Sequence, residues 1–230
     1  RLFLSFRIYE MPDYEKKEAV TAVGCITSPD GGETWTRLDG APLMLPASAD
    51  EVDPIVCGDS REGRIADTGS MALSPAGVPH LTYSVKTPQG AETFLAVARP
   101  DGGWRQIGLN QFLPMEFRDW AMVHQGGVAF AADGRLIVVG TLQNLRAGEE
   151  AWGHPGTEIA RFTSRDGGGS FTAELLTPLD PKVPHWLPNL EKPTGFNVMP
   201  AQPGLIYTAG GAGAGLGDVL SNQVWWRPLA

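Results

Sequence analysis

The chain has little of what metal-bound, disulfide-bonded or membrane-spanning proteins require. Its 230 residues include only 4 histidines and two cysteines, Cys25 and Cys57, which lack the spacing of metal ligands. Two buried thiols are the expectation for this pair, and a disulfide is the alternative. No apolar run approaches the roughly 18 residues of a membrane span, and no signal peptide opens the chain. We therefore expect no metal, no cofactor and no membrane partner.

Positive charge is also scarce. The 18 Lys and Arg residues against 26 Asp and Glu residues leave a formal net charge of −8. This sign disfavours nucleic acid and anionic membranes as partners. It still permits a small anionic ligand, because a few arginines in a cleft outweigh a distant acidic surface.

Glycine and proline, by contrast, are abundant, with 29 Gly and 19 Pro. Both residues disfavour helix interiors, so this composition favours a turn-rich all-β protein. The hydrophobic content of 42% suffices for a sizeable core, and 230 residues without a long polar linker fit a single domain.

The stretch "SPDGGETW" combines a turn signal with the regular spacing of Ser28, Asp30, Gly32 and Trp35. Pro, Asp and Gly in this order fold a chain back between two strands, here "AVTAVGCITS" and "TWTRL". The Asp30 carboxylate can accept hydrogen bonds from turn amides, and the indole can pack across the turn. We interpret the motif as a structural hairpin, with a reaction centre as the alternative.

The same spacing recurs in "SRDGGGSF", where Asp166 takes the position of Asp30, and "RPDGGW" with Asp101 is a shortened form. Short strands recur with it, in "RLFLSF", "GVPHLTYSV", "GRLIVVG" and "GLIYTAG". Four-stranded antiparallel units repeating at this length are typical of β-propeller blades. We predict a little under four blades, at about residues 1–45, 46–110, 111–180 and 181–230.

The two end units differ from the others. The first lacks its opening strand, so missing blades or a partner chain are needed to close the ring. The fourth is expected to open with "GFNVMPAQ", followed by "GLIYTAGG" and "GDVLSNQVWW".

The Ser-x-Asp-x-Gly-x-x-Trp pattern resembles the Asp-box, or BNR, repeat of sialidases and other carbohydrate-active propellers. In those families the box lies on the turn between the third and fourth strands of a blade, away from the active site. A longer series resembles, in the same order, the C-terminal part of the BNR-repeat polysaccharide lyases that include ulvan lyases: "LFLSFR", "SPDGGETWTRLDGAPLMLP", "GVPHLTY", "WLPNLEKPTGFN" and "NQVWW". This resemblance implies a seven-bladed propeller that cleaves a uronate-containing glycan by β-elimination. The histidines and the Tyr/Arg pair of such lyases belong to blades upstream of the "LFLSFR" match.

The rim opposite the Asp-box turns is the usual ligand face of a propeller. We expect it to hold four substrate-binding residues, Arg7, Arg118, Trp120 and Glu191. Arginine supplies a bidentate fork for a carboxylate, and an indole face stacks on a sugar ring. Each has a structural alternative, and Arg7 could instead pair with Glu10.

Tyr9 and His124 are the candidate catalytic residues. Lyase chemistry needs a cation to neutralise the uronate carboxylate and a Tyr or His to remove the C5 proton. His124 follows Trp120 and Met122 on alternate positions, and its alternative is a hydrogen-bonded core imidazole. A rim acid such as Asp119 could act as general acid or base if a pocket raised its pKa.

Two classes of function fit these residues. The first is a carbohydrate-active enzyme, with a polysaccharide lyase favoured over a sialidase-like hydrolase. "FRIY", residues 6 to 9, resembles the Phe-Arg-Ile-Pro element of sialidases but lacks its proline. The second is a non-catalytic glycan-binding propeller. In both, the expected partner is an acidic polysaccharide or oligosaccharide, and the expected location is secreted or periplasmic.

Overall fold

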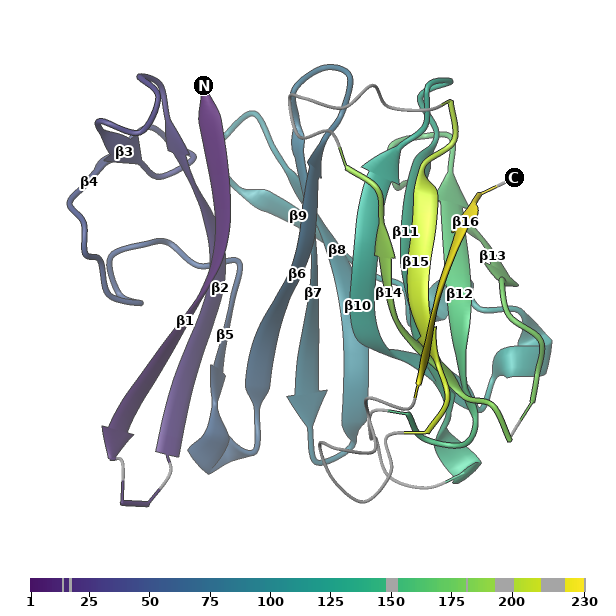
Figure 1. The fold of residues 1–230 in the computed structure, drawn as a ribbon. Helices are drawn as coiled ribbons and strands as arrows, with labels where there is room; N and C mark the ends of the chain where they lie inside the picture. Colours follow the sequence, from purple (N-terminus) through teal and green to yellow (C-terminus); the bar gives the residue numbers. More distant parts are fainter. Residues whose placement is uncertain are drawn as a thin grey trace.

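The computed structural model of the chain describes residues 1–13, 15–16, 18–147, 153–180, 182–192, 201–211 and 222–229. They form four antiparallel β-sheets that follow one another in chain order across the molecule (Figure 1). The helices among these residues are 3-10 turns of three residues, and none could cross a membrane. The predicted all-β class is therefore confirmed.

The second and third sheets each consist of four strands paired in chain order, as predicted for propeller blades. The second sheet comprises β6 (Ile65–Leu73), β7 (Pro79–Thr87), β8 (Gly90–Ala98) and β9 (Trp104–Gly108). The third comprises β10 (Trp120–Phe130), β11 (Leu136–Asn144), β12 (Thr157–Ser164) and β13 (Thr172–Leu175).

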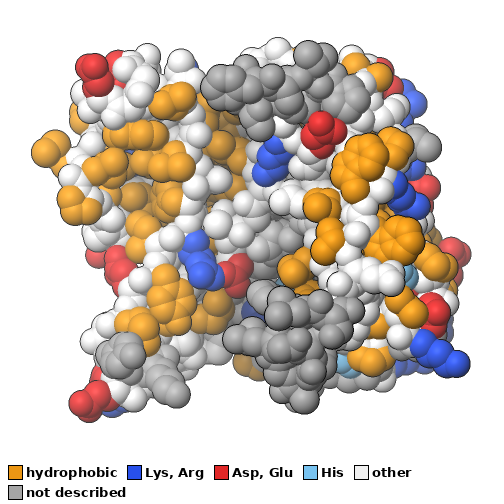
Figure 2. Space-filling model, in the orientation of Figure 1, with side chains coloured by type: hydrophobic (Ala, Val, Ile, Leu, Met, Phe, Trp, Pro, Cys, Tyr) orange, Lys and Arg blue, Asp and Glu red, His pale blue; other side chains and the backbone are white. Residues whose placement is uncertain are grey.

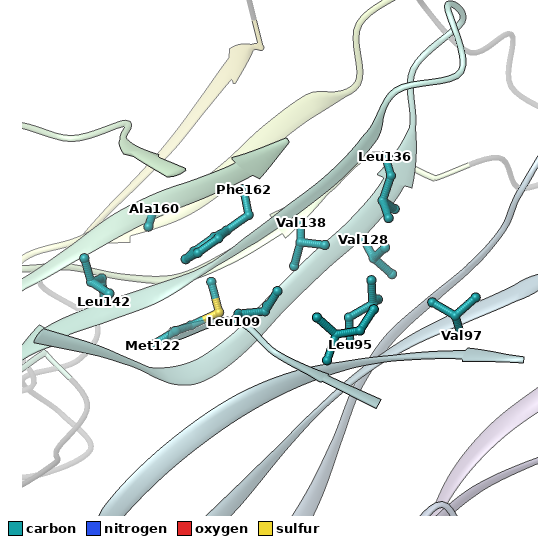
Figure 3. Packing of buried hydrophobic residues seen from close by; sticks show 11 residues of the cluster. Leu95, Val97, Leu109, Met122, Val128, Leu136, Val138, Leu142, Ala160 and Phe162 are labelled. Atoms are coloured by element: carbon teal, nitrogen blue, oxygen red, sulfur yellow. The ribbon is translucent and has the colours of Figure 1, made fainter. Parts of the chain in front are cut away.

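The core lies between neighbouring sheets, so a central sheet contributes side chains to two clusters. In β11, Leu136 and Val138 pack between the second and third sheets, whereas Ile137 and Val139 pack toward the fourth. Successive side chains of a strand point to opposite faces, and burial of both faces explains the continuous apolar run "LIVV". Figure 3 shows the first cluster, to which the second sheet contributes Leu95.

The first sheet contains five strands, two more than the three predicted for a four-stranded unit without its opening strand. Its strands are β1 (Leu2–Asp13), β2 (Glu18–Ser28), β3 (Trp35–Thr36), β4 (Pro42–Leu43) and β5 (Val56–Asp59). The last of these falls in the stretch assigned to the second blade, but it pairs with β2. β3 pairs with β2 at Thr27 alone, so it leaves the rest of that edge of β2 unpaired. β5 pairs with this edge along Val20–Val23.

The fourth sheet has three strands in the described residues: β14 (His185–Leu190), β15 (Gly204–Ala209) and β16 (Gln223–Pro228). The prediction that "GFNVMPAQ" opens this unit is wrong, because "HWLPNL" pairs with β15 instead; residues 193–200 lie outside the described residues. Two glycines of β10 allow β14 to approach closely. A Cβ on Gly126 would lie 2.6 Å from the Pro188 carbonyl oxygen, and one on Gly127 would lie 2.4 Å from the Leu190 nitrogen.

The "SPDGGETW" motif forms the turn between β2 and β3. The Ser28 hydroxyl donates to Asp30 Oδ1 at 2.7 Å and accepts from the Gly32 amide at 2.8 Å. Asp30 Oδ1 also accepts from the Thr34 amide at 2.9 Å. Hydrogen bonds from the Thr34 hydroxyl and amide, and from Ser28, hold the pKa of Asp30 well below its usual value. The turn's own donors therefore engage this carboxylate, as the hairpin interpretation predicts.

The turn between β12 and β13 repeats this pattern. The Ser164 hydroxyl donates to Asp166 Oδ1 at 2.7 Å and accepts from the Gly168 amide at 2.8 Å. In the shortened turn between β8 and β9, Asp101 accepts from the amide two residues later at 3.0 Å. All three turns lie at one end of the sheets, the upper edge in Figure 1. We call this end the turn face and the opposite end the loop face.

Candidate functional site

Arg7 and Tyr9 occupy alternate positions on β1, so their side chains share one face of the strand. Arg7 forms an ion pair with Asp67 of β6, and its guanidinium carbon lies 5.4 Å from the centre of the Tyr9 ring. The alternative pairing with Glu10 is not formed, because the Glu10 carboxylate accepts from the Ala49 amide at 3.0 Å. The arginine thus links the first and second sheets.

This pair remains open to solvent. The side chains of Arg7 and Asp67 are 38% and 42% exposed, and Tyr9 is 51% exposed. A guanidinium has five N–H donors, and the contact with Asp67 engages one nitrogen. The geometry can therefore hold the arginine in place and still present donors to an anionic ligand.

Arg118 precedes β10 and Trp120 begins it, and among the described residues no ion pair or ring contact joins either of them to the Arg7 pair. Asp119 Oδ2 lies 2.8 Å from Arg146 Nη2 and 3.7 Å from Arg118 Nε. Asp119 is therefore an ion-pair partner of both arginines. Trp120 packs edge-on against Phe117, with ring centres 5.6 Å apart, at the margin of the core. The third sheet thus carries its own ion-pair cluster at the loop face.

His124 lies in an irregular part of β10. The register with β11 shifts between Met122 and His124 and again between Gln125 and Val128. Such bulges re-aim side chains, so the expected alternation breaks: Met122 is fully buried, whereas His124 is half-buried. Its neighbour Gln125 donates to the Thr68 carbonyl oxygen of β6 at 3.0 Å.

Glu191 follows the last residue of β14 and lies at the turn face, away from the other predicted ligands. Its carboxylate accepts from the Gly204 amide at 3.1 Å. Lys192 extends from the fourth sheet to the second, where its ammonium donates to the Ser70 hydroxyl at 2.9 Å. Burial lowers the pKa of Lys192.

Sequence reasoning missed a buried polar network in the third and fourth sheets. Glu158, 1% exposed, lies 2.7 Å from His185 Nδ1 and accepts from the Thr177 hydroxyl at 2.6 Å. It also accepts from the Asp180 amide at 3.0 Å. Thr177 and Asp180 lie in the loop after β13, and His185 begins β14, so this network joins the third and fourth sheets. Nothing in "TEIARFTS" distinguishes a buried glutamate from an exposed one.

The two cysteines are not bridged. Cys25 is buried with its sulfur 3.7 Å from the Met71 sulfur, and burial raises its pKa to about 12. Cys57 is exposed, so the expectation of two buried thiols is wrong for this residue: in β5, Val56 and Gly58 point inward and Cys57 points outward. No group of three or more His, Cys, Asp or Glu side chains in the described ranges could hold a metal ion.

No protein-family model and no curated protein sequence matches the chain. Among solved structures, the chain is similar to an ulvan lyase from a new polysaccharide lyase family, determined with and without a bound saccharide. The identity is 12%, the TM-score is 0.54, and the match covers 99% of this chain and 52% of that one. An endo-arabinase from Bacteroides thetaiotaomicron VPI-5482 matches at 14% identity and a TM-score of 0.47, over 92% of this chain and 66% of that one.

At these identities, the likeness concerns the fold alone. The four consecutive antiparallel sheets and the similarity to the ulvan lyase show that the chain has a β-propeller fold. The chain spans about half the length of that enzyme.

Proposed function

We propose that the chain is part of a carbohydrate-active propeller that acts on an acidic glycan, as a polysaccharide lyase. The observation that carries this proposal is the half-exposed Arg7, held by Asp67 and flanked by Tyr9. A uronate carboxylate would take the remaining guanidinium donors in the bidentate geometry that arginine favours.

The chemistry needs three things at one sugar. Neutralising the uronate carboxylate makes the C5 proton acidic, and a base removes that proton. The C4–O bond then breaks as the C4–C5 double bond forms, and the leaving oxygen keeps the bonding pair and takes up a proton to become a hydroxyl. Arg7 supplies the neutralising charge. The Tyr9 phenol, next to that charge, is the proposed proton-transfer group, and His124 on the third sheet is the second candidate.

The wider setting of the proposal follows from the resemblance. We propose that the Ser-x-Asp-x-Gly turns are Asp-box repeats, that the complete propeller has seven blades, and that the protein is secreted or periplasmic. Arg118, Trp120 and Glu191 stay predictions as substrate-binding residues, although Glu191 lies at the turn face and not on the opposite rim, the expected ligand face. The separate placement of Arg7 and Arg118 favours an extended glycan over a single sugar as the ligand that contacts both.

Ultraviolet absorbance tests the reaction directly. Elimination leaves a double bond conjugated to the carboxylate, which absorbs in the ultraviolet, whereas hydrolysis leaves none. We expect the protein, incubated with a panel of uronate polysaccharides, to generate this absorbance. Reducing ends without new absorbance would instead identify a glycoside hydrolase, and glycan binding without either signal would identify a non-catalytic binding propeller.

Replacing Arg7 tests the residue. Arg7→Gln should lower kcat/KM by about tenfold to a hundredfold, because one charge-assisted contact is lost. The melting temperature should change little, since exposed ion pairs contribute little to stability. Arg99→Gln, which removes a 57% exposed arginine at the turn face, is the matched control. Equal kcat/KM in the two variants would remove Arg7 from the site.

A further inference from the structure

A second group of arginines lies on the outer part of the third sheet. Arg135, Arg161 and Arg165, with the hydroxyl groups of Thr163 and Thr172, line a cavity of about 360 Å³. We call it the arginine pocket. Its volume is at the lower end of the range for small-ligand sites.

The arginine pocket is separate from the Arg7 pair. On β12, Ala160 and Phe162 pack toward the second sheet. Arg161 and Thr163 alternate with them and therefore point to the opposite face. A ligand in the pocket would contact the side of the third sheet that faces away from Arg7.

Two of the arginines are held in position. Arg135 Nε lies 2.6 Å from Asp133 Oδ2, and Arg161 Nε donates to Glu174 Oε1 at 2.8 Å. The two arginine side chains are only 20% and 16% exposed, whereas their acidic partners are half exposed. Ordering these long side chains beforehand removes an entropic cost that a ligand would otherwise bear.

Donors of Arg135, Arg165 and two threonines have no acceptor among the residues that the structure describes. No ion pair or hydrogen bond joins Arg165 to these residues, and Arg135 uses its Nε alone. Thr163 and Thr172 are direct cross-strand partners, and neither hydroxyl is hydrogen-bonded within the described ranges. Three arginines and one glutamate line the pocket, on a chain whose net charge is −8.

We propose that the arginine pocket binds an oxyanion carried by an acidic glycan, either a carboxylate or a sulfate ester. Guanidinium forks and hydroxyl groups are the donors that such oxygens accept from. The proposal of an oxyanion site depends only on the pocket, whereas the proposal that a glycan carries this oxyanion rests on the proposed function. Bound in this way, a glycan would contact the propeller at two places, and the pocket would select charged chains over neutral ones.

Inorganic sulfate is the first probe, titrated into the full chain and followed by the NMR signals of the arginine Nε–H groups. Arg165→Gln should weaken sulfate binding by about tenfold, the effect of losing one charge-assisted contact. Arg99→Gln is the control, because it removes a 57% exposed arginine with the same change in charge from the second sheet. Equal sulfate affinity in the two variants overturns the site.

Carboxylated, sulfated and neutral oligosaccharides of equal length then identify the carrier. We expect Arg165→Gln to weaken the binding of one charged class and to leave the neutral class unchanged. Charged oligosaccharides that bind Arg165→Gln as tightly as the unmodified protein overturn the glycan carrier. Sulfate binding that depends on Arg165, in a protein that binds no glycan, would refute the proposed function and support the oxyanion site.

Discussion

The first and third sheets carry the same Ser-x-Asp-x-Gly turn but differ in how their strands are buried. Residues 136–143 of β11 are all buried, whereas β1 has no buried residue along its length. Figure 2 shows hydrophobic side chains gathered over the first sheet, on the left of the view. The large exposed hydrophobic residues of β1 are Leu2, Leu4, Tyr9 and Met11.

The comparison shows that the turn depends on local hydrogen bonds, whereas the burial of a strand depends on distant segments. The turn is satisfied by donors and acceptors within a few residues, so it forms equally well in both sheets. Burial depends on the position in the sheet: β11 lies between two strands and has a core cluster on each face, whereas within the described residues β1 is an edge strand that pairs with β2 alone. Solvent access at β1 is also what makes Arg7 and Tyr9 available to a ligand, because binding groups must remain exposed on a rigid scaffold.

The largest expected change in stability comes from replacing one leucine by alanine in each of the two sheets. Leu136→Ala removes a fully buried side chain and should reduce the free energy of unfolding by about 2–5 kcal/mol. Leu4→Ala removes a side chain that is 46% exposed, and its effect should stay below about 1 kcal/mol. Denaturant unfolding of the two variants measures both. Equal losses would mean that β1 is covered in solution, by a partner or by further chain.

A smaller loss of stability is expected from a substitution between the third and fourth sheets. An alanine at Gly127 would bring its Cβ to 2.4 Å from the Leu190 nitrogen, and β14 would have to move. We expect a loss of about 1–3 kcal/mol and faster hydrogen exchange of the amides of β15. Gly103→Ala is the control, since the nearest atom to its Cβ would be 3.3 Å away. Unchanged exchange in β15 would show that the fourth sheet does not depend on this approach.

These positions also show how far sequence reasoning can reach. Turns and most strands could be predicted because their signals are local: proline, aspartate and glycine at fixed offsets, and apolar runs between them. The pairing of β5 with β2 could not, since it depends on an edge that β3 leaves open. The bulge that turns His124 away from the Met122 face, and the position of Glu191 at the turn face, likewise arise from contacts between distant segments.

The smallest effect concerns the repeated turn itself. Asp30→Ala and Asp166→Ala each remove a carboxylate that accepts from a serine hydroxyl and from the amide and hydroxyl of the residue four positions later; Asp166 also accepts from the Gly169 amide at 2.9 Å. Both substitutions should lower the melting temperature at neutral pH, with a slightly larger effect for Asp166→Ala. The pKa of each carboxyl is depressed in the folded protein, chiefly by hydrogen bonds from Thr34 and Ser170 respectively. Their contribution to stability is therefore present above the unfolded pKa of about 4 and is lost as the pH falls through the lower folded value.

Melting temperatures of the unmodified protein and both variants, recorded from pH 7 down to about pH 3, measure this contribution. The difference between the unmodified protein and each variant should shrink below about pH 4, while glycan binding at neutral pH stays unchanged. A larger effect for Asp30→Ala, which removes fewer turn hydrogen bonds, would show that the surrounding sheet, and not the turn alone, determines what the motif contributes. Lost activity at an unchanged melting temperature would restore the reaction-centre interpretation, because a purely structural turn cannot affect catalysis without affecting stability.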